Sequence, residues 1–194
     1  MAPGQVNGAG KMPFMNTPNP TVRLKNAWRS SHPWIFQKLV EKPAAKPKSG
    51  TLVEVVGVDG EWIGRGFYNG HSRIAVRILE THPDIPVDAG WFSRKIADAV
   101  SLRRDVLKLD AVSDAWRVVH SEGDGLSGLV VDRYGDLIVV EFFAAGMFRH
   151  REWIFLDCAL NGRSTMLTWL TRRRKPRRRR RRRTAKHRIK TRCL

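Results

Sequence analysis

The sequence has few cysteines, no long hydrophobic run and no N-terminal leader. Cys158 and Cys193 are the only cysteines among 194 residues, which is too few for a disulfide framework and has no zinc-ligand spacing. No apolar run approaches the roughly 18 to 20 residues that cross a bilayer. Residues 1–20 lack the apolar stretch of a signal peptide and are rich in Pro, Gly and Asn. We therefore expect a cytoplasmic protein that has a disordered lead-in and binds neither metal nor membrane.

Positive charge is concentrated near the C-terminus. The formal net charge is +18, from 36 basic and 18 acidic residues. Residues 155–194 hold 16 of the basic residues but only one acid, Asp157, which leaves 20 basic and 17 acidic side chains in the first 154 residues. Because this larger part is nearly neutral, the bulk charge alone does not predict that it binds nucleic acid.

Residues 21–86 have the pattern of short strands joined by tight turns. Val22 and Leu24 alternate with basic residues, as in an edge strand, and two aromatics and an Ile follow Pro33. Further strands are predicted at 52–56, 61–67 and 72–79, with a two-residue turn at Asp59-Gly60 between the first two of these. Five short strands with glycines at the corners predict a small barrel-like β domain.

In residues 87–160 the spacing of apolar residues changes from the alternation of a strand to the period of a helix and then back. This change predicts a second, α+β unit. Asp88 is placed as the N-cap of a helix of about 18 residues, because apolar residues then recur at helical spacing. Three strands of an antiparallel meander follow, and a second helix is expected to begin near Met147; the strands are predicted at 116–120, 128–132 and 137–143.

Residues 161–194 form an Arg-rich tail in which we find no apolar periodicity. Arg172 to Arg183 contains eleven basic residues interrupted only by Pro176. A run of like charge repels itself and buries no apolar surface, so we expect this tail to be disordered. Two origins are open: a frameshift or gene-model error, which translation of the other two reading frames would test, or a genuine basic arm that binds polyanions.

Gly-Asp-Gly-Leu-Ser-Gly at 123–128 matches the G-x-G-x-x-G pattern of nucleotide-binding turns. That motif works where a strand runs into a helix, whereas here another strand is predicted to follow. We therefore interpret the glycine run as a structural turn. Cys158 is interpreted as a core residue, and His120 and Ser121 are not interpreted as a catalytic pair, because neighbours in a strand point to opposite faces.

A longer segment that contains those glycines resembles part of a known family. Residues 122–136 resemble a segment of the bacterial 23S ribosomal RNA cytosine-5 methyltransferases that begin with a PUA domain. Three further motifs occur in the same order as in that family, and the resemblance covers about residues 22–154; the motifs are His-Pro-Trp-Ile-Phe at 32–36, Trp-Ile-Gly-Arg-Gly-Phe-Tyr-Asn at 62–69 and Phe-Ser-Arg-Lys-Ile at 92–96.

The resemblance implies an α+β chain with a PUA-like pseudo-barrel at 21–86 that contacts RNA, followed by the family's α+β linker domain at 87–160. The family's third domain is Rossmann-like, binds S-adenosylmethionine and supplies a nucleophilic cysteine. After Trp153 this chain departs from the family pattern, and neither cysteine lies in a motif like the family's Thr-Cys-Ser site. We therefore expect an RNA-binding N-terminal portion without the catalytic domain, with no catalytic residue and no bound cofactor. The alternative is a non-catalytic RNA-binding protein with a genuine basic tail.

Candidate RNA contacts combine cations for phosphate with polar groups for ribose or base. One group lies at the entrance of the first domain, and the other surrounds a predicted β corner near Gly66 and Gly70. The first group is Arg23, Lys25 and Arg29; the second is Arg65, Tyr68, Asn69, His71, Ser72 and Arg73.

Overall fold

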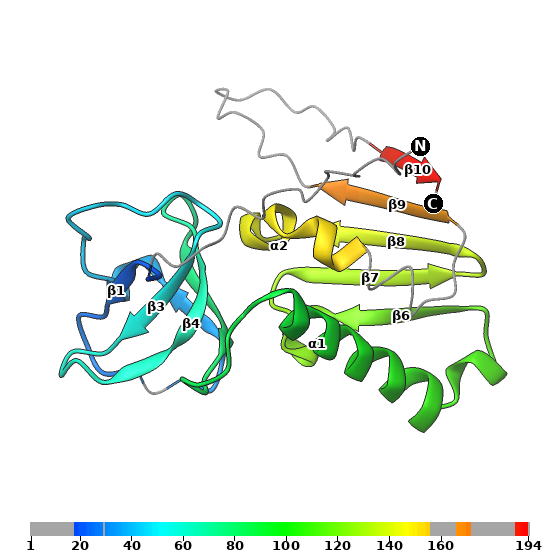
Figure 1. Cartoon of the computed structure of the whole chain (residues 1–194), viewed down its shortest axis with the longest axis horizontal. Helices are drawn as coiled ribbons and strands as arrows, with labels where there is room; N and C mark the ends of the chain where they lie inside the picture. The colour runs from blue at the N-terminus through cyan, green and yellow to red at the C-terminus, as the bar shows by residue number, and fades with distance from the viewer. Residues whose placement is uncertain (1–17, 29, 156–165, 172–188, 194) are drawn as a thin grey trace, which may run out of the picture.

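The structure is a computed structural model that describes residues 18–28, 30–155, 166–171 and 189–193. Within these residues the chain forms two five-stranded sheets that lie side by side along the long axis of the molecule (Figure 1). Helices are associated mainly with the second sheet. The mixed α+β class predicted from the sequence is confirmed.

The first sheet curls into a small barrel. Its order is β1-β3-β4-β5-β2, with β1 parallel to β3 and the other neighbours antiparallel. The curl closes where Leu24 bridges Val40 and the amide of Lys25 donates to the carbonyl of Leu39 at 2.8 Å. The barrel-like unit is therefore confirmed, and its strands are β1 (Thr21–Arg23), β2 (Trp34–Phe36), β3 (Leu52–Val56), β4 (Trp62–Tyr68) and β5 (Ile74–Glu80).

The turn between β3 and β4 differs from the predicted two-residue turn at Asp59-Gly60. The amide of Gly60 donates to the carbonyl of Gly57 at 3.2 Å, so Val58 and Asp59 are the central residues. Gly60 then takes a φ of 85°, which glycine adopts without strain. The strand pairing that follows has a register shift between Val55 and Val56, with Ile63 as the extra residue in β4.

Asp88 starts helix α1 as predicted, because its carboxylate accepts a hydrogen bond from the amide of Trp91 at 2.8 Å. Helix α1 (Ala89–Ser101) has 13 residues and continues as five residues of π-helix (Leu102–Val106). The expected length of about 18 residues is confirmed for the combined helix. Within the described part of the chain, three short 3₁₀ turns also occur, at Gln37–Leu39, Leu109–Ala111 and Ser121–Asp124.

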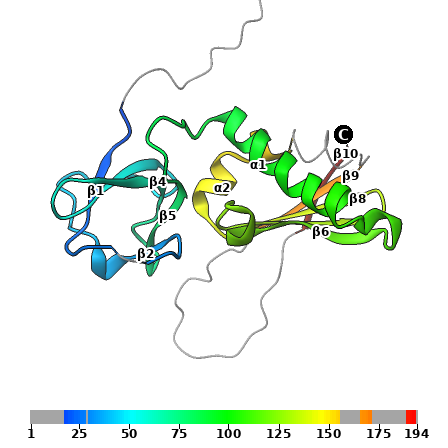
Figure 2. The same cartoon turned by 90° about the horizontal axis from the view of Figure 1, so that it is seen from below.

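The second sheet has the order β10-β9-β8-β7-β6 (Figure 1). Its first three strands in the chain form the predicted antiparallel meander, and α1 covers one face of it (Figure 2). A short helix and helical residues 151–155 follow. The elements are β6 (Ala115–His120), β7 (Leu129–Tyr134), β8 (Leu137–Phe142) and α2 (Ala145–Arg149).

The expectation of a tail without structure is wrong for two segments. Strand β9 (Met166–Thr171) pairs in parallel with β8, and β10 (Ile189–Cys193) pairs antiparallel with β9. The sequence Met-Leu-Thr-Trp-Leu-Thr is rich in residues that favour strands, and it satisfies backbone groups on the edge of β8. The Arg172–Arg183 run and Cys158 lie outside the described residues.

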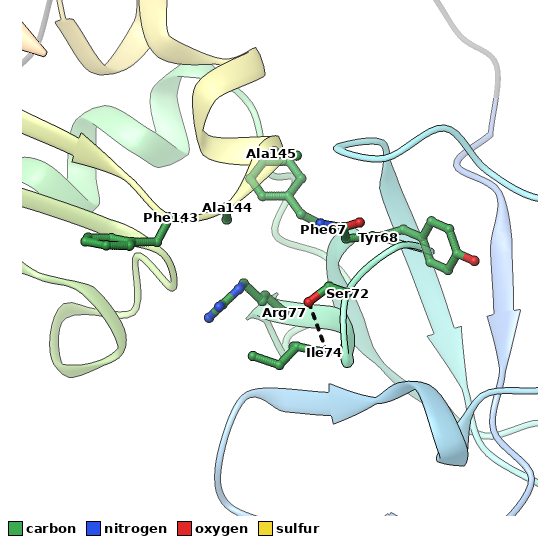
Figure 3. Close-up of a pocket in the computed structure, with 10 residues that line it drawn as sticks. Phe67, Tyr68, Ser72, Ile74, Arg77, Phe143, Ala144 and Ala145 are labelled. Atoms are coloured by element: carbon green, nitrogen blue, oxygen red, sulfur yellow. Dashed lines mark hydrogen bonds between the residues drawn. The ribbon is translucent and has the colours of Figure 1, made fainter. Parts of the chain in front are cut away.

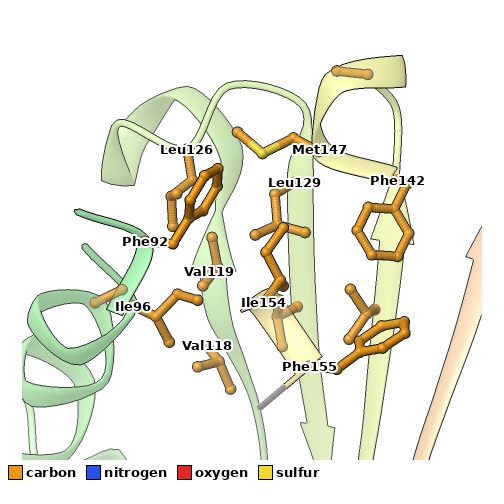
Figure 4. Packing of buried hydrophobic residues seen from close by; sticks show 14 of the residues in the cluster. Phe92, Ile96, Val118, Val119, Leu126, Leu129, Phe142, Met147, Ile154 and Phe155 are labelled. Atoms are coloured by element: carbon orange, nitrogen blue, oxygen red, sulfur yellow. The ribbon is translucent and has the colours of Figure 1, made fainter. Parts of the chain in front are cut away.

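One apolar core joins the two sheets. It contains Phe92 and Ile96 of α1 and the inward residues of β6, β7 and β8 (Figure 4). Phe67 and Leu79 of the first sheet belong to the same buried cluster, and the Phe67 ring stacks on His150 with centroids 5.2 Å apart. A second cluster fills the barrel itself. None of the helices in the described part of the chain has the length and hydrophobicity of a membrane span.

Candidate nucleic-acid interface

The predicted corner is the connection from Asn69 to Arg73 between β4 and β5. The side-chain oxygen of Asn69 accepts hydrogen bonds from the amide of His71 at 3.1 Å and from the hydroxyl of Ser49 at 3.2 Å. Ser72 accepts a bond from the first amide of β5 at 3.2 Å. These local bonds fix the corner, while the side chains of His71 and Arg73 are exposed.

Two of the predicted contact residues are not available at this corner. Tyr68 is only 1% exposed and its ring belongs to the barrel core, which disfavours the predicted RNA contact. Arg65 lies further back in β4, where its Nε is 3.3 Å from Glu54. Its other nitrogens donate to the carbonyls of Ile85 and Pro83 at 2.7 and 2.8 Å. Arg65 therefore anchors the segment that leads to α1.

The two predicted groups of contacts are not brought together. Arg23 pairs with Val56, and its guanidinium reaches the carbonyls of Gly57 and Val58 at 3.3 Å, beside the β3–β4 turn. The Asn69–Arg73 corner lies at the other end of these strands. Lys25 follows β1 and is exposed, and Arg29 lies outside the described residues.

A narrow crevice separates the corner from the second unit (Figure 3). Its volume is about 30 Å³, far below the several hundred Å³ of a pocket that encloses a small molecule. The Phe143 ring extends away from Ser72 and Arg77 (Figure 3). The crevice therefore suits surface contact with a polymer better than enclosure of a ligand; it is lined by Phe67, Tyr68, Asn69, Ser72, Ile74, Arg77 and residues 143–146.

Three exposed cations that we did not single out from the sequence surround this corner. Lys46 donates to the carbonyl of Gly70 at 3.3 Å, and Lys48 lies in the same loop. Arg149 of α2 reaches the hydroxyl of Thr51 at 3.5 Å. Their signal in the sequence was weak, because isolated basic residues in loops are usually solvated.

Below the crevice, Glu122 ties the two units together. One oxygen, Oε1, accepts hydrogen bonds from the indole of Trp34 at 2.7 Å and from the guanidinium of Arg77 at 2.8 Å. The hydroxyl of Ser127 donates to the same oxygen at 2.7 Å. The Arg77 guanidinium also lies 4.9 Å from the centre of the Trp34 ring. Two residues of the barrel thus converge on a carboxylate of the second unit.

This arrangement keeps Glu122 ionised. Burial disfavours the charged form, but hydrogen bonds from Ser121, Ser127 and Trp34 outweigh it and lower the pKa of Glu122 to about 2. Burial lowers the pKa of Arg77, against the effect of Glu122, although an arginine still keeps its charge at neutral pH. The pair is therefore a charged contact across the junction.

The glycine run at 123–128 does not fit a cofactor turn. Gly125 and Gly128 take positive φ values of 71° and 91°, and strand β7 follows directly. Asp124 accepts a hydrogen bond from Arg103 at 2.7 Å, and Ser121 accepts one from the amide of Gly128 at 2.8 Å. The prediction of a structural turn is confirmed, and these residues offer no helix N-terminus to a nucleotide. Across the described residues, no group of three or more His, Cys, Asp or Glu is placed to hold a metal ion.

Comparison with known families identifies the first sheet. A family described as PUA-like domain matches residues 23–81. This match covers the barrel from the last residue of β1 to the end of β5 and supports the resemblance noted from the sequence.

Three bacterial proteins named ribosomal RNA large subunit methyltransferase I are similar to this chain. The protein of Alteromonas mediterranea is 36% identical over 126 residues, 65% of this chain and 32% of the relative. Those of Shewanella frigidimarina and Vibrio cholerae are 35% and 33% identical, over 69% and 70% of this chain and 35% and 36% of their own lengths. The chain therefore spans about a third of the length of these relatives.

Two solved structures have a similar fold. SMU.776, assigned as a methyltransferase and crystallised with SAH, superposes with a TM-score of 0.64 at 12% identity, over 80% of this chain and 40% of its own. A Streptococcus mutans protein assigned as a SAM-dependent methyltransferase gives a TM-score of 0.63 at 10% identity, over 78% of this chain and 40% of its own. At this identity the similarity concerns the fold.

Proposed function

We propose that this chain, which is related to the ribosomal RNA large subunit methyltransferase I proteins over about a third of their length, binds ribosomal RNA through its PUA-like domain. The observation that carries the proposal is the PUA-like match over residues 23–81. The Asn69–Arg73 corner, where His71 and Arg73 are exposed, gives that domain a place of contact, and ribosomal RNA as the partner implies action in the cytoplasm.

Within the domain, we assign the contact to the corner and not to the Arg23 and Lys25 end. Arg73 is an exposed cation, and the side chains of Asn69 and Ser72 are held in place by local hydrogen bonds. A cation beside fixed polar groups suits a phosphate next to a ribose hydroxyl. Arg23, by contrast, already directs its guanidinium at two backbone carbonyls.

We further propose that this chain binds RNA without transferring a methyl group. The described residues use their G-x-G-x-x-G segment as a structural turn, which leaves S-adenosylmethionine without that common kind of phosphate or carboxylate site. In this proposal the cofactor belongs to the family and not to this chain.

Binding and catalysis are tested in one experiment. The purified full chain is incubated with 23S ribosomal RNA and S-adenosylmethionine labelled in its methyl group. We expect retention of the RNA on the protein and no label in the RNA. Label that enters the RNA would overturn the proposed lack of methyl transfer, whereas absence of RNA binding would overturn the proposed function itself.

The site of contact is tested by two pairs of substitutions in the full chain. Arg73→Gln with Asn69→Ala should weaken binding, and Arg23→Gln with Lys25→Gln should change it less, although the second pair removes one more charge. Because every variant keeps the same C-terminal tail, the tail contributes equally to each measurement. A larger loss in the Arg23 and Lys25 pair, which removes two charges, would mean that only net charge matters and would overturn the assignment to the corner.

A further inference from the structure

The corner of the PUA-like domain is continuous with part of the second unit. The Lys46 ammonium touches the corner at the carbonyl of Gly70, and Arg149 touches the same loop at Thr51. A Cβ placed on Gly50 would lie 3.1 Å from the backbone of Ala145. The loop before β3, the corner and helix α2 therefore meet in one surface.

This surface carries more positive than negative charge. Lys46, Lys48, Arg73 and Arg149 are all exposed, and within the described residues none of them forms an ion pair. The three segments, 42–51, 69–77 and 143–151, contain no Asp or Glu, and the exposed Glu41 and Glu152 flank two of them. The excess of positive charge attracts the phosphates of a polymer.

The two halves of the surface are held in a fixed relation. The Glu122 contacts join the barrel to the second unit on one side of the crevice. On the other side Gly146 packs so closely on Phe67 that a Cβ at Gly146 would lie 2.0 Å from its ring. Arg149 is therefore not a cation on a separate domain but has a set position relative to Arg73.

We propose that the RNA-binding surface is composite: an RNA strand runs from the corner of the PUA-like domain onto helix α2, with phosphates at Lys46, Lys48, Arg73 and Arg149. This inference rests on the proposed function and extends it to residues of the second unit. If four cations each neutralise one phosphate of a single strand, this surface contributes a slope of about −3 to the plot of log affinity against log salt concentration.

The test compares three single substitutions in the full chain, each of which removes one exposed positive charge. Arg73→Gln removes a positive charge from the PUA-like half of the surface, and Arg149→Gln removes one from the α2 half. Lys108→Gln removes a positive charge beyond the far end of α1 and serves as the control. Affinity for a 23S ribosomal RNA fragment is measured by fluorescence anisotropy at several salt concentrations, with the thermal midpoint of each variant as a check on folding.

We expect Arg149→Gln and Arg73→Gln each to weaken binding by roughly three- to fivefold relative to Lys108→Gln, and to make the salt slope shallower by about 0.7. If Arg73→Gln weakens binding and Arg149→Gln matches the control, the composite surface is wrong and the PUA-like contact stands. If both match the control, both proposals fail.

Discussion

Replacement of Glu122 by Gln tests the contact that joins the two units. The substitution keeps the size of the side chain but removes the charge that Arg77 and the Trp34 indole share at Oε1. The side chains of Arg77 and Glu122 are 16% and 27% exposed, so solvent screens their attraction only in part. We expect the folded protein to lose a substantial part of its stability at neutral pH.

The size of the loss follows from the pKa of Glu122, which is lowered from 4.5 to about 2. Each unit of pKa corresponds to about 1.4 kcal/mol, so ionisation of this carboxyl contributes about 3 kcal/mol to folding at neutral pH. Because the pKa in the folded state is depressed, the contribution is present above about pH 4.5 and is lost as the pH falls towards 2. Glu122→Gln does not titrate and lacks this dependence.

The assay is urea unfolding followed by tryptophan fluorescence, at pH 7 and at pH 3. The difference in unfolding free energy between the native chain and Glu122→Gln should be about 3 kcal/mol at pH 7 and clearly smaller at pH 3. Glu152→Gln, which changes a carboxylate with a side chain 65% exposed, is the control. A difference at pH 7 no larger than the control's, or one that does not change with pH, would refute the reasoning.

Two further substitutions test single features of the fold by thermal or urea unfolding. Asp88→Ala removes the cap on the Trp91 amide and should cost about 1 kcal/mol, whereas Asp84→Ala, in the exposed turn before it, should cost much less. Tyr68→Phe removes a buried hydroxyl without a hydrogen-bond partner in the described structure, so stability should stay equal or rise by up to about 1 kcal/mol, with RNA binding unchanged; a clear loss of binding would restore Tyr68 as a contact.

Much of the fold follows from local patterns in the sequence. Strand β3 has the predicted bounds of residues 52–56, and the helix that starts after Asp88 has the expected length when its π-helical end is included. Both depend on residues close together in the chain, where periodicity and capping decide the structure. Strand β9 was missed because a six-residue segment beside a dense Arg run has its pairing partner in β8, more than twenty residues earlier.

The candidate surface was harder to predict, because it depends on contacts between distant residues. Tyr68 has the polar tip of a contact residue, yet β4 passes between the barrel core and the second unit and buries its ring. The pairing of Arg77 with Glu122 joins positions 45 residues apart. Arg149 enters the surface only because α2 packs beside the loop before β3. No local pattern marks any of these three relations.

The four motifs that carry the family resemblance meet at the junction between the two units. Trp34 and Glu122, from the first and last motifs, share a hydrogen bond of 2.7 Å. Phe67 and Phe92, from the other two, stack with centroids 6.5 Å apart. The motifs that the chain shares with the family are therefore those that attach the PUA-like domain to the second unit. Of the four cations proposed to hold RNA, none lies within a motif, so substitutions at the motifs should disturb stability first, whereas substitutions at the cations should disturb RNA binding alone.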